Sequence, residues 1–125
     1  MTYLDTHVVV WLYDGKVGKL SKVAAEQIQN DRELLVSPAV MLELQFLHDI
    51  QRLNRTALTI VTALVKEIGL RICEQSFIAV IESALDQKWV RDPFDRLIVA
   101  QAIANEAPLV TKDEKIRRHY RRAIW

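Results

Sequence analysis

Two aspartates stand close together in the stretch RDPFDRLIVAQAIANE, directly before a run of mostly apolar residues. Asp92 followed by Pro93 is typical of a helix N-cap with proline at the first helical position. Asp95 then falls at the third helical position, where the positive end of the helix dipole favours a carboxylate. Asp95 also shares its helical face with Ile98 and Ala102, which should pack inward. Capping explains Asp92, whereas for Asp95 a structural and a chemical role both stay open.

Glu43 is a second acid in apolar surroundings. It lies in SPAVMLELQFLHDIQRL, and its neighbours at helical spacing are Ala39, Val40, Phe46, Leu47 and Ile50. We therefore expect this helix to bury the face that carries Glu43. An isolated buried carboxylate costs several kcal/mol, so Glu43 must be neutralised, paired or metal-bound. Arg91 or Arg96 is the structural alternative to a metal.

Two further acids follow β-leaning segments. Asp5 comes directly after TYL, and Asp113 follows PLVT with Lys112 between. Each could simply cap a helix. However, open parallel sheets bind ligands beyond the carboxyl ends of their strands, which is where both acids are expected.

Four carboxylates that meet at one edge repel one another unless a cation lies among them. All four are hard oxygen ligands, and no cluster of cysteines or histidines competes with them. Mg²⁺ or Mn²⁺ fits such a set better than zinc does.

The elements that would position these acids alternate along the chain. The β-leaning segments are residues 2–4, 33–37, 70–73, 108–111 and, as a candidate fifth, 123–125. The helical segments between them are residues 21–30, 37–53, 57–69, 75–89 and 93–106. Such alternation implies crossover connections. We predict an α/β fold, a three-layer α/β/α sandwich with a mainly parallel sheet of four or five strands.

Length and composition limit the class of protein. The 125 residues suffice for a single domain, residues 1–125, with its own core. The one cysteine, Cys73, permits no disulfide framework within the chain and favours a reducing, cytoplasmic location. Neither a signal peptide nor an apolar run of membrane-spanning length is found, so no membrane association is expected.

The formal net charge of +1 conceals an uneven distribution. Residues 112–122 hold six basic side chains against two acidic ones: Lys112, Lys115, Arg117, Arg118, Arg121 and Arg122 against Asp113 and Glu114. This segment is a candidate RNA-binding surface, although charged runs are often only solvated helix faces.

Four blocks carry a family resemblance: YLDTHVVVWL, VSPAVMLEL, RDPFDRLIVAQA and LVTKDEKI. In this order and spacing they resemble the signature blocks of the PIN-domain family, specifically the VapC-type toxins of prokaryotic toxin–antitoxin pairs. The resemblance covers nearly the whole chain. It implies a Mg²⁺- or Mn²⁺-dependent endoribonuclease that hydrolyses RNA, with catalytic and metal-binding acids at Asp5, Glu43, Asp95 and Asp113. It also implies a homodimer and a small antitoxin that blocks the acidic site.

Several neighbours of the acids are candidate supporting residues. Thr6 and Thr111 could orient a carboxylate or a bound water, or be ordinary turn and strand residues. Asp92 is expected as a cap with a supporting role, and Arg96, one turn later, as its ion-pair partner or as a contact to RNA phosphate. His7 is considered as a general base but favoured as a helix-start residue. Trp11 and Trp125 are expected to pack rather than to stack on bases.

Other function classes fit less well. A phosphoacceptor signalling domain needs adjacent acids after its first strand, where LDTH offers one. A haloacid-dehalogenase-type phosphatase needs Asp-x-Asp, but residue 7 is histidine. A non-catalytic PIN-like module that binds RNA or protein would fit the fold. Such modules usually lose acids, however, and this chain keeps all four.

Overall fold

The computed structural model describes all 125 residues and contains one five-stranded sheet. The strands are β1 (Thr2–Leu4), β2 (Leu34–Val36), β3 (Arg71–Ile72), β4 (Leu109–Val110) and β5 (Ala123–Ile124). Every pairing is parallel, and the order across the sheet is β3-β2-β1-β4-β5. The predicted parallel sheet is confirmed, and the candidate fifth segment is a strand.

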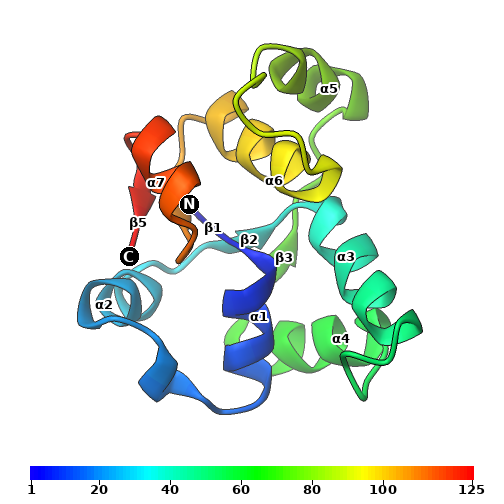
Figure 1. Ribbon diagram of the computed structural model, residues 1–125. Coiled ribbons are helices and arrows are strands. Elements are labelled where there is room, and N and C mark those ends of the chain that lie inside the picture. The colour runs from blue at the N-terminus through cyan, green and yellow to red at the C-terminus, as the bar shows by residue number, and fades with distance from the viewer.

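Helices cover both faces of this sheet. They are α1 (Thr6–Tyr13), α2 (Lys22–Asn30), α3 (Pro38–Asp49), α4 (Ala57–Ile68), α5 (Phe77–Leu85), α6 (Pro93–Ala104) and α7 (Glu114–His119), with a 3-10 turn, η1, at Val17–Lys19. Right-handed crossovers place α1 to α4 on one face and α5 to α7 on the other. Figure 1 shows α5, α6 and α7 above the sheet and α1, α2 and α4 below it. The predicted three-layer sandwich is confirmed. None of the helices combines the length and apolarity needed to cross a bilayer.

Two helices end earlier than the apolar spacing predicts. The segment 37–53 stops being helical after Asp49, because the backbone turns at Gln51, which has a φ of 64°. The backbone N–H of Leu53 then bonds back to the carbonyl of Leu47. The segment 75–89 is helical only from Phe77 to Leu85. In both cases the residues after the helix are apolar at helical spacing although their backbone is not helical.

The core lies against both faces of the central strands, where Tyr3, Leu4 and Leu109 are fully buried. In α3, Val40 and Leu44 point into this core. The prediction for the rest of that helix face is partly wrong: Phe46 is 47% exposed and Ile50 44% exposed. Leu44 takes the inward position, whereas Phe46 packs at the surface against Phe94, with ring centroids 5.8 Å apart. Glu43 therefore lies at the border of the buried face.

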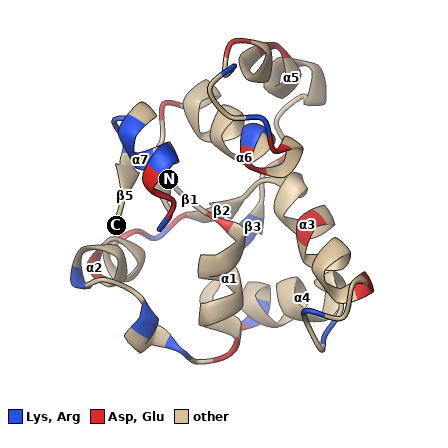
Figure 2. Ribbon diagram, viewed as in Figure 1, with Lys and Arg blue, Asp and Glu red and all other residues tan.

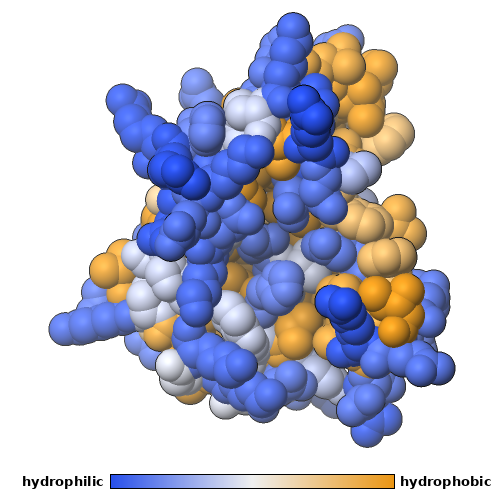
Figure 3. Space-filling view, viewed as in Figure 1, coloured by the Kyte–Doolittle hydropathy of each residue, from blue (hydrophilic) through white to orange (hydrophobic).

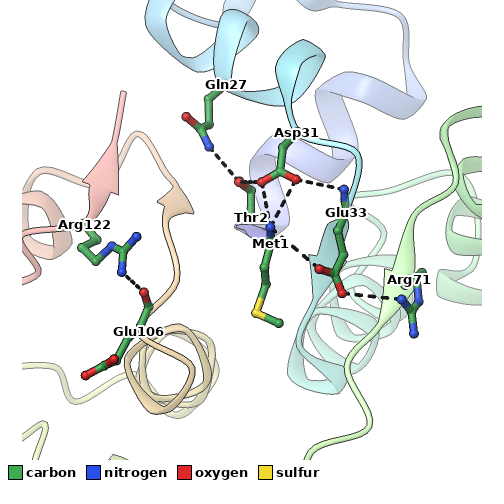
Figure 4. Close-up of polar contacts among 8 residues, drawn as sticks. All are labelled: Met1, Thr2, Gln27, Asp31, Glu33, Arg71, Glu106 and Arg122. Atoms are coloured by element: carbon green, nitrogen blue, oxygen red, sulfur yellow. Dashed lines mark hydrogen bonds and ion pairs between the residues drawn. The ribbon is translucent and has the colours of Figure 1, made fainter.

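The amino edge of the sheet is held by a polar network (Figure 4). The Met1 ammonium group lies 3.0 Å from Asp31 and 3.8 Å from Glu33. Arg71 at the start of β3 approaches Glu33 to 3.5 Å, and the hydroxyl of Thr2 donates to Asp31. The acids at this edge of the sheet thus have cationic partners.

Candidate metal centre

The opposite, carboxyl edge of the sheet contains a topological switch point. From β1 the chain moves outward to β2 and β3 on one side, and β4 and β5 lie on the other. A crevice forms where the strand order reverses in this way, between the carboxyl ends of β1 and β4. Asp5 directly follows β1, and Thr111 directly follows β4. The Thr111 hydroxyl donates a 2.6 Å hydrogen bond to Asp5 Oδ2 and so joins the two strand ends.

Asp5 is held rigidly in this crevice. Only 6% of the residue is exposed. Its Oδ1 accepts a 2.8 Å hydrogen bond from the backbone N–H of Thr6, so the same side chain caps α1. Burial raises the pKa of Asp5, while the hydrogen bonds from Thr111 and Thr6 lower it only in part. The carboxylate is therefore fixed in orientation but is not neutralised by a cation.

Glu43 and Asp95 bring two more carboxylates to Asp5. Glu43 comes from α3, and Asp95 from the first turn of α6. One oxygen of each of the three side chains lies within 4.8 Å of the others. In Figure 2 acidic segments at the start of α1, in α3 and at the start of α6 surround the same part of the sheet edge. Helices from both faces of the sheet thus converge on one acidic triad.

The triad has no ion-pair partner in the protein. No lysine or arginine nitrogen lies within 4.0 Å of these carboxylates. Burial, followed by the charges of Asp5, Asp92, Glu43 and Asp113, raises the pKa of Asp95 to about 7. Burial also raises the pKa of Glu43, with Asp5 adding to the effect. The pairing of Glu43 with Arg91 or Arg96, considered from the sequence, is absent.

Asp113 lies near the triad but not within it. A cleft of about 370 Å³ is lined by Asp5, His7, Trp11, Glu43, Asp95, Lys112 and Asp113. Asp113 caps α7 by accepting a 2.9 Å hydrogen bond from the backbone N–H of Ile116. Its own backbone N–H donates to the Thr111 hydroxyl at 3.1 Å. The four predicted acids therefore form a cluster of three carboxylates and a fourth carboxylate elsewhere in the same cleft.

The donor set suits a hard divalent cation. Three carboxylates supply oxygen ligands, and no cysteine lines the cleft. In addition, the Thr6 hydroxyl is fully buried without a hydrogen bond of standard geometry. It lies close enough to Glu43 to lower the pKa of that carboxyl. A buried hydroxyl beside carboxylates that have no cationic partner is what a site built for an ion or its water would contain.

Asp92 caps α6 as predicted, whereas Arg96 does not make the predicted ion pair. Asp92 is exposed and caps α6, accepting a 3.0 Å hydrogen bond from the backbone N–H of Asp95. Arg96 does not pair with Asp92. It donates instead to the carbonyls of Ala84, at 2.7 Å, and Leu85, at 3.2 Å. Carbonyls in the last turn of a helix have no N–H donor four residues later in that helix, so the guanidinium can bind there. The Ala84 carbonyl also accepts a 3.0 Å hydrogen bond from the backbone N–H of Gln87.

The predicted basic segment is mostly outside the cleft. Lys112 lines the cleft itself. The other five basic residues are exposed on α7 and on the turn after it: Lys115, Arg117, Arg118, Arg121 and Arg122. Arg122 donates to the backbone carbonyl of Glu106 (Figure 4).

His7, weighed from the sequence as a general base but favoured for a helix-start or partner-contact role, and Trp11, expected to pack, both line the cleft. They are four residues apart on α1, which places them on one helical face. That spacing, on a helix that begins beside Asp5, was the signal available in the sequence.

Comparisons with known proteins agree with this geometry. Residues 2–122 match the family model of the PIN domain. Ribonuclease VapC22 of Mycobacterium tuberculosis is 32% identical over 122 residues, which cover 93% of this chain and 89% of that protein.

Solved structures with a similar fold belong to toxin–antitoxin systems. A toxin–antitoxin complex from Klebsiella pneumoniae gives a TM-score of 0.66 at 18% identity, covering 100% of this chain and 97% of the other. VapBC2 of Rickettsia felis, bound to a promoter DNA fragment, gives a TM-score of 0.61 at 21% identity. The match covers 94% of this chain and 92% of the other. The family model spans nearly the whole chain, so the protein belongs to the PIN-domain family.

Proposed function

We propose that this protein is a divalent-metal-dependent endoribonuclease that hydrolyses RNA phosphodiester bonds and acts as the toxin of a toxin–antitoxin module. The observation that carries the proposal is the triad of Asp5, Glu43 and Asp95, whose oxygens converge without any cation from the protein. The relative from Mycobacterium tuberculosis, named a ribonuclease, supports the activity.

Asp5, Glu43 and Asp95 would hold the ion, which we propose to be Mg²⁺ or Mn²⁺. When bound, such an ion supplies charge neutralisation at the scissile phosphate and acidifies a water nucleophile. The hydrogen bonds from Thr111 and from the Thr6 backbone fix the direction of the Asp5 lone pairs before the ion arrives. Preorganisation of this kind avoids reorganising the ligands during the reaction.

The remaining residues of the cleft would act on the RNA. Asp113 adds negative charge in the cleft and can accept a hydrogen bond from a water that approaches the phosphate. Lys112 is the only ammonium group of the cleft and is suited to a phosphate oxygen. Beyond it, Figure 2 shows basic segments along α7, which would hold the RNA backbone away from the reacting bond.

RNA cleavage by purified, partner-free protein tests the activity. We expect single-stranded RNA to be cut with Mg²⁺ or Mn²⁺ and not with EDTA. Asp95→Asn should lower the rate by orders of magnitude, because a ligand of the ion is lost. Asp86→Asn is the matched control, since Asp86 is an exposed aspartate at the end of α5 that does not line the cleft.

Two results would contradict the proposal. Full activity of the Asp95→Asn protein would remove Asp95 from the site. RNA binding without cleavage at any divalent ion would support the alternative, a non-catalytic PIN-like binding module.

Partners are a further part of the proposal. The similar solved structures are toxin–antitoxin complexes, which supports a small antitoxin partner that covers the acidic cleft.

A homodimer is supported by an exposed apolar surface on α3 and α5. Its members are Leu42, Phe46, Phe77, Ile78 and Leu85, and Figure 3 shows apolar atoms gathered over α5 and α3.

The dimer is testable by sedimentation. Phe77→Glu places a charge in the centre of that apolar surface and should shift the protein to a monomer. Leu58→Glu on α4 is the control, because Leu58 is equally exposed but lies outside the surface. A monomeric parent, or an unchanged dimer in Phe77→Glu, would contradict the assignment.

A further inference from the structure

We propose that Trp11 is a stacking platform for an unpaired nucleobase next to the scissile phosphate, with Lys19 and Lys112 placed to bind the flanking phosphates. The inference rests on the proposed ribonuclease function and goes further, because it assigns a base-binding subsite. It also revises the expectation that Trp11 serves only for packing.

Trp11 occupies an unusual position for an apolar side chain. It is the single hydrophobic residue lining the cleft, among four acids, His7 and Lys112. One side of Trp11 packs against the hydrophobic core, and the residue is only partly buried. The indole is thus anchored by the core and still borders the charged cleft.

Neighbouring rings fix the orientation of the indole. The ring centroid of Trp125 lies 5.8 Å from that of Trp11 with an interplanar angle of 51°. The ring centroid of His7 lies 6.2 Å from that of Trp11 with an interplanar angle of 49°. Both contacts are tilted, so neither neighbour stacks flat on the indole. A ring held in this way is preorganised to receive a flat partner.

Two ammonium groups belong to the proposed subsite. Lys19 Nζ lies over the Trp11 ring, 5.9 Å from its centroid, and Lys112 lines the same cleft as Trp11. Sites for single-stranded nucleic acid combine aromatic platforms for bases with cationic groups for the backbone. An unpaired base can leave its strand to stack on the indole, whereas a base within a duplex is held by pairing and stacking. The subsite would therefore favour single-stranded RNA without reading a sequence.

Trp89 provides the contrast. His119 stacks flat on its ring, with centroids 4.6 Å apart and an interplanar angle of 5°, so one face of Trp89 is already covered. Trp89 also does not line the acidic cleft. It is therefore the matched control for changes at Trp11.

The test uses a labelled single-stranded RNA that the parent protein cleaves at one mapped bond, and the same RNA made abasic beside that bond. Trp11→Leu should lower kcat/KM on intact RNA about tenfold, the range of one lost base–aromatic stack. On the abasic RNA the same change should have less than about a twofold effect, because the stack is already missing. Trp11→Phe should retain most of the activity, and Trp89→Leu should behave like the parent on both RNAs.

Quenching of Trp11 fluorescence by RNA gives a second readout, in a protein that keeps Trp11. In a Trp89→Phe, Trp125→Phe background, intact RNA should quench the fluorescence of Trp11, whereas abasic RNA should not. This measurement holds even if Trp11→Leu folds poorly.

Equal losses on intact and abasic RNA, or equal quenching by both, would overturn the stacking subsite while leaving the ribonuclease proposal intact. A parent protein that neither cleaves nor binds RNA would overturn both.

Discussion

Acids at the two edges of the sheet differ in their partners. Asp31 and Glu33 at the amino edge form ion pairs. Asp5, Glu43 and Asp95 at the carboxyl edge form none, and each has a raised pKa. Burial without a cation is destabilising, so the three carboxylates are retained at a cost in folding free energy. The proposed divalent ion would relieve their repulsion and so account for that cost.

The raised pKa of Asp95 predicts how the metal-free protein responds to pH. Its pKa is about 7 in the folded protein against an ordinary value of 3.8, so between these values the folded state binds more protons than the unfolded state. The stability that this difference contributes in EDTA should therefore be fully present below pH 3.8, fall as the pH rises towards 7 and be lost above 7. Thermal melts across this range measure the effect.

Asp95→Asn provides the control for this pH dependence. The variant removes the titrating charge, so its melting temperature should exceed that of the parent at pH 8 and depend less on pH. A lower melting temperature than the parent at pH 8 would mean that ionised Asp95 stabilises the fold, contrary to the account.

Thr111 is predicted to act on the ion through Asp5. Thr111→Val keeps the shape of the buried side chain but removes the hydrogen bond to Asp5 Oδ2. We expect Mn²⁺ affinity, measured by calorimetry, to fall roughly 10- to 100-fold. Thr111→Ser keeps the hydroxyl, so its Mn²⁺ affinity should be close to that of the parent. Equal affinity in the valine and serine variants would show that the hydroxyl has no role at the ion.

Among the elements, α6 has two separate tasks. Its first turn presents Asp95 to the cleft, and one residue later Arg96 binds the carbonyls of Ala84 and Leu85 at the end of α5. The contact fixes α5 against α6, and Ser83 adds a hydrogen bond to the carbonyl of Ala100. The helix that carries Asp95 is thus held in place by its neighbour.

Arg96→Ala should therefore affect stability more than chemistry. Both carbonyls lose the guanidinium, and only Ala84 keeps a backbone donor, the N–H of Gln87, so the free energy of unfolding should fall by about 1 to 3 kcal/mol. Urea denaturation measures this loss. RNA affinity and its salt dependence should stay close to those of the parent. A weaker salt dependence with unchanged stability would instead indicate a contact between Arg96 and RNA phosphate.

The basic helix α7 should govern the salt dependence of RNA binding. Arg117 and Arg118 are both exposed in its last turn. Replacing both by alanine should weaken binding and lower the slope of log K against log salt by roughly 0.7 per lost phosphate contact. The cleavage rate of saturated enzyme should change less. An unchanged slope in fluorescence-anisotropy titrations would make α7 a solvated surface only.

At the scale of the whole molecule, much of the fold could be predicted from local patterns. The alternation of short apolar segments with amphipathic ones specifies crossovers, and crossovers specify a parallel sheet. Helix lengths were less predictable, because Ile50 and Leu53 continue an apolar pattern through a turn. The exposure of Phe46 also depends on a partner, Phe94, that is distant in sequence.

The same limit applies to the site. Asp5 could be placed at the sheet edge because it follows β1, and Asp95 because it shares a buried helical face. The separation of Asp113 from the triad depends on the path of the loop after β4, which no local pattern encodes. Likewise, Asp92 at one helical turn from Arg96 suggested an ion pair, but carbonyls at the end of α5 accept the guanidinium instead.

We propose that Asp5, Glu43 and Asp95 together hold one divalent ion. Anomalous diffraction from crystals grown with Mn²⁺ would locate that ion. We expect an anomalous peak between the three carboxylates, with an oxygen of each at about 2.0 to 2.6 Å, the range of hard divalent cations. The peak should be lost in the Asp95→Asn protein under the same conditions. The absence of that peak from the parent, or a single Mn²⁺ ion bound elsewhere while RNA is still cleaved, would contradict the account.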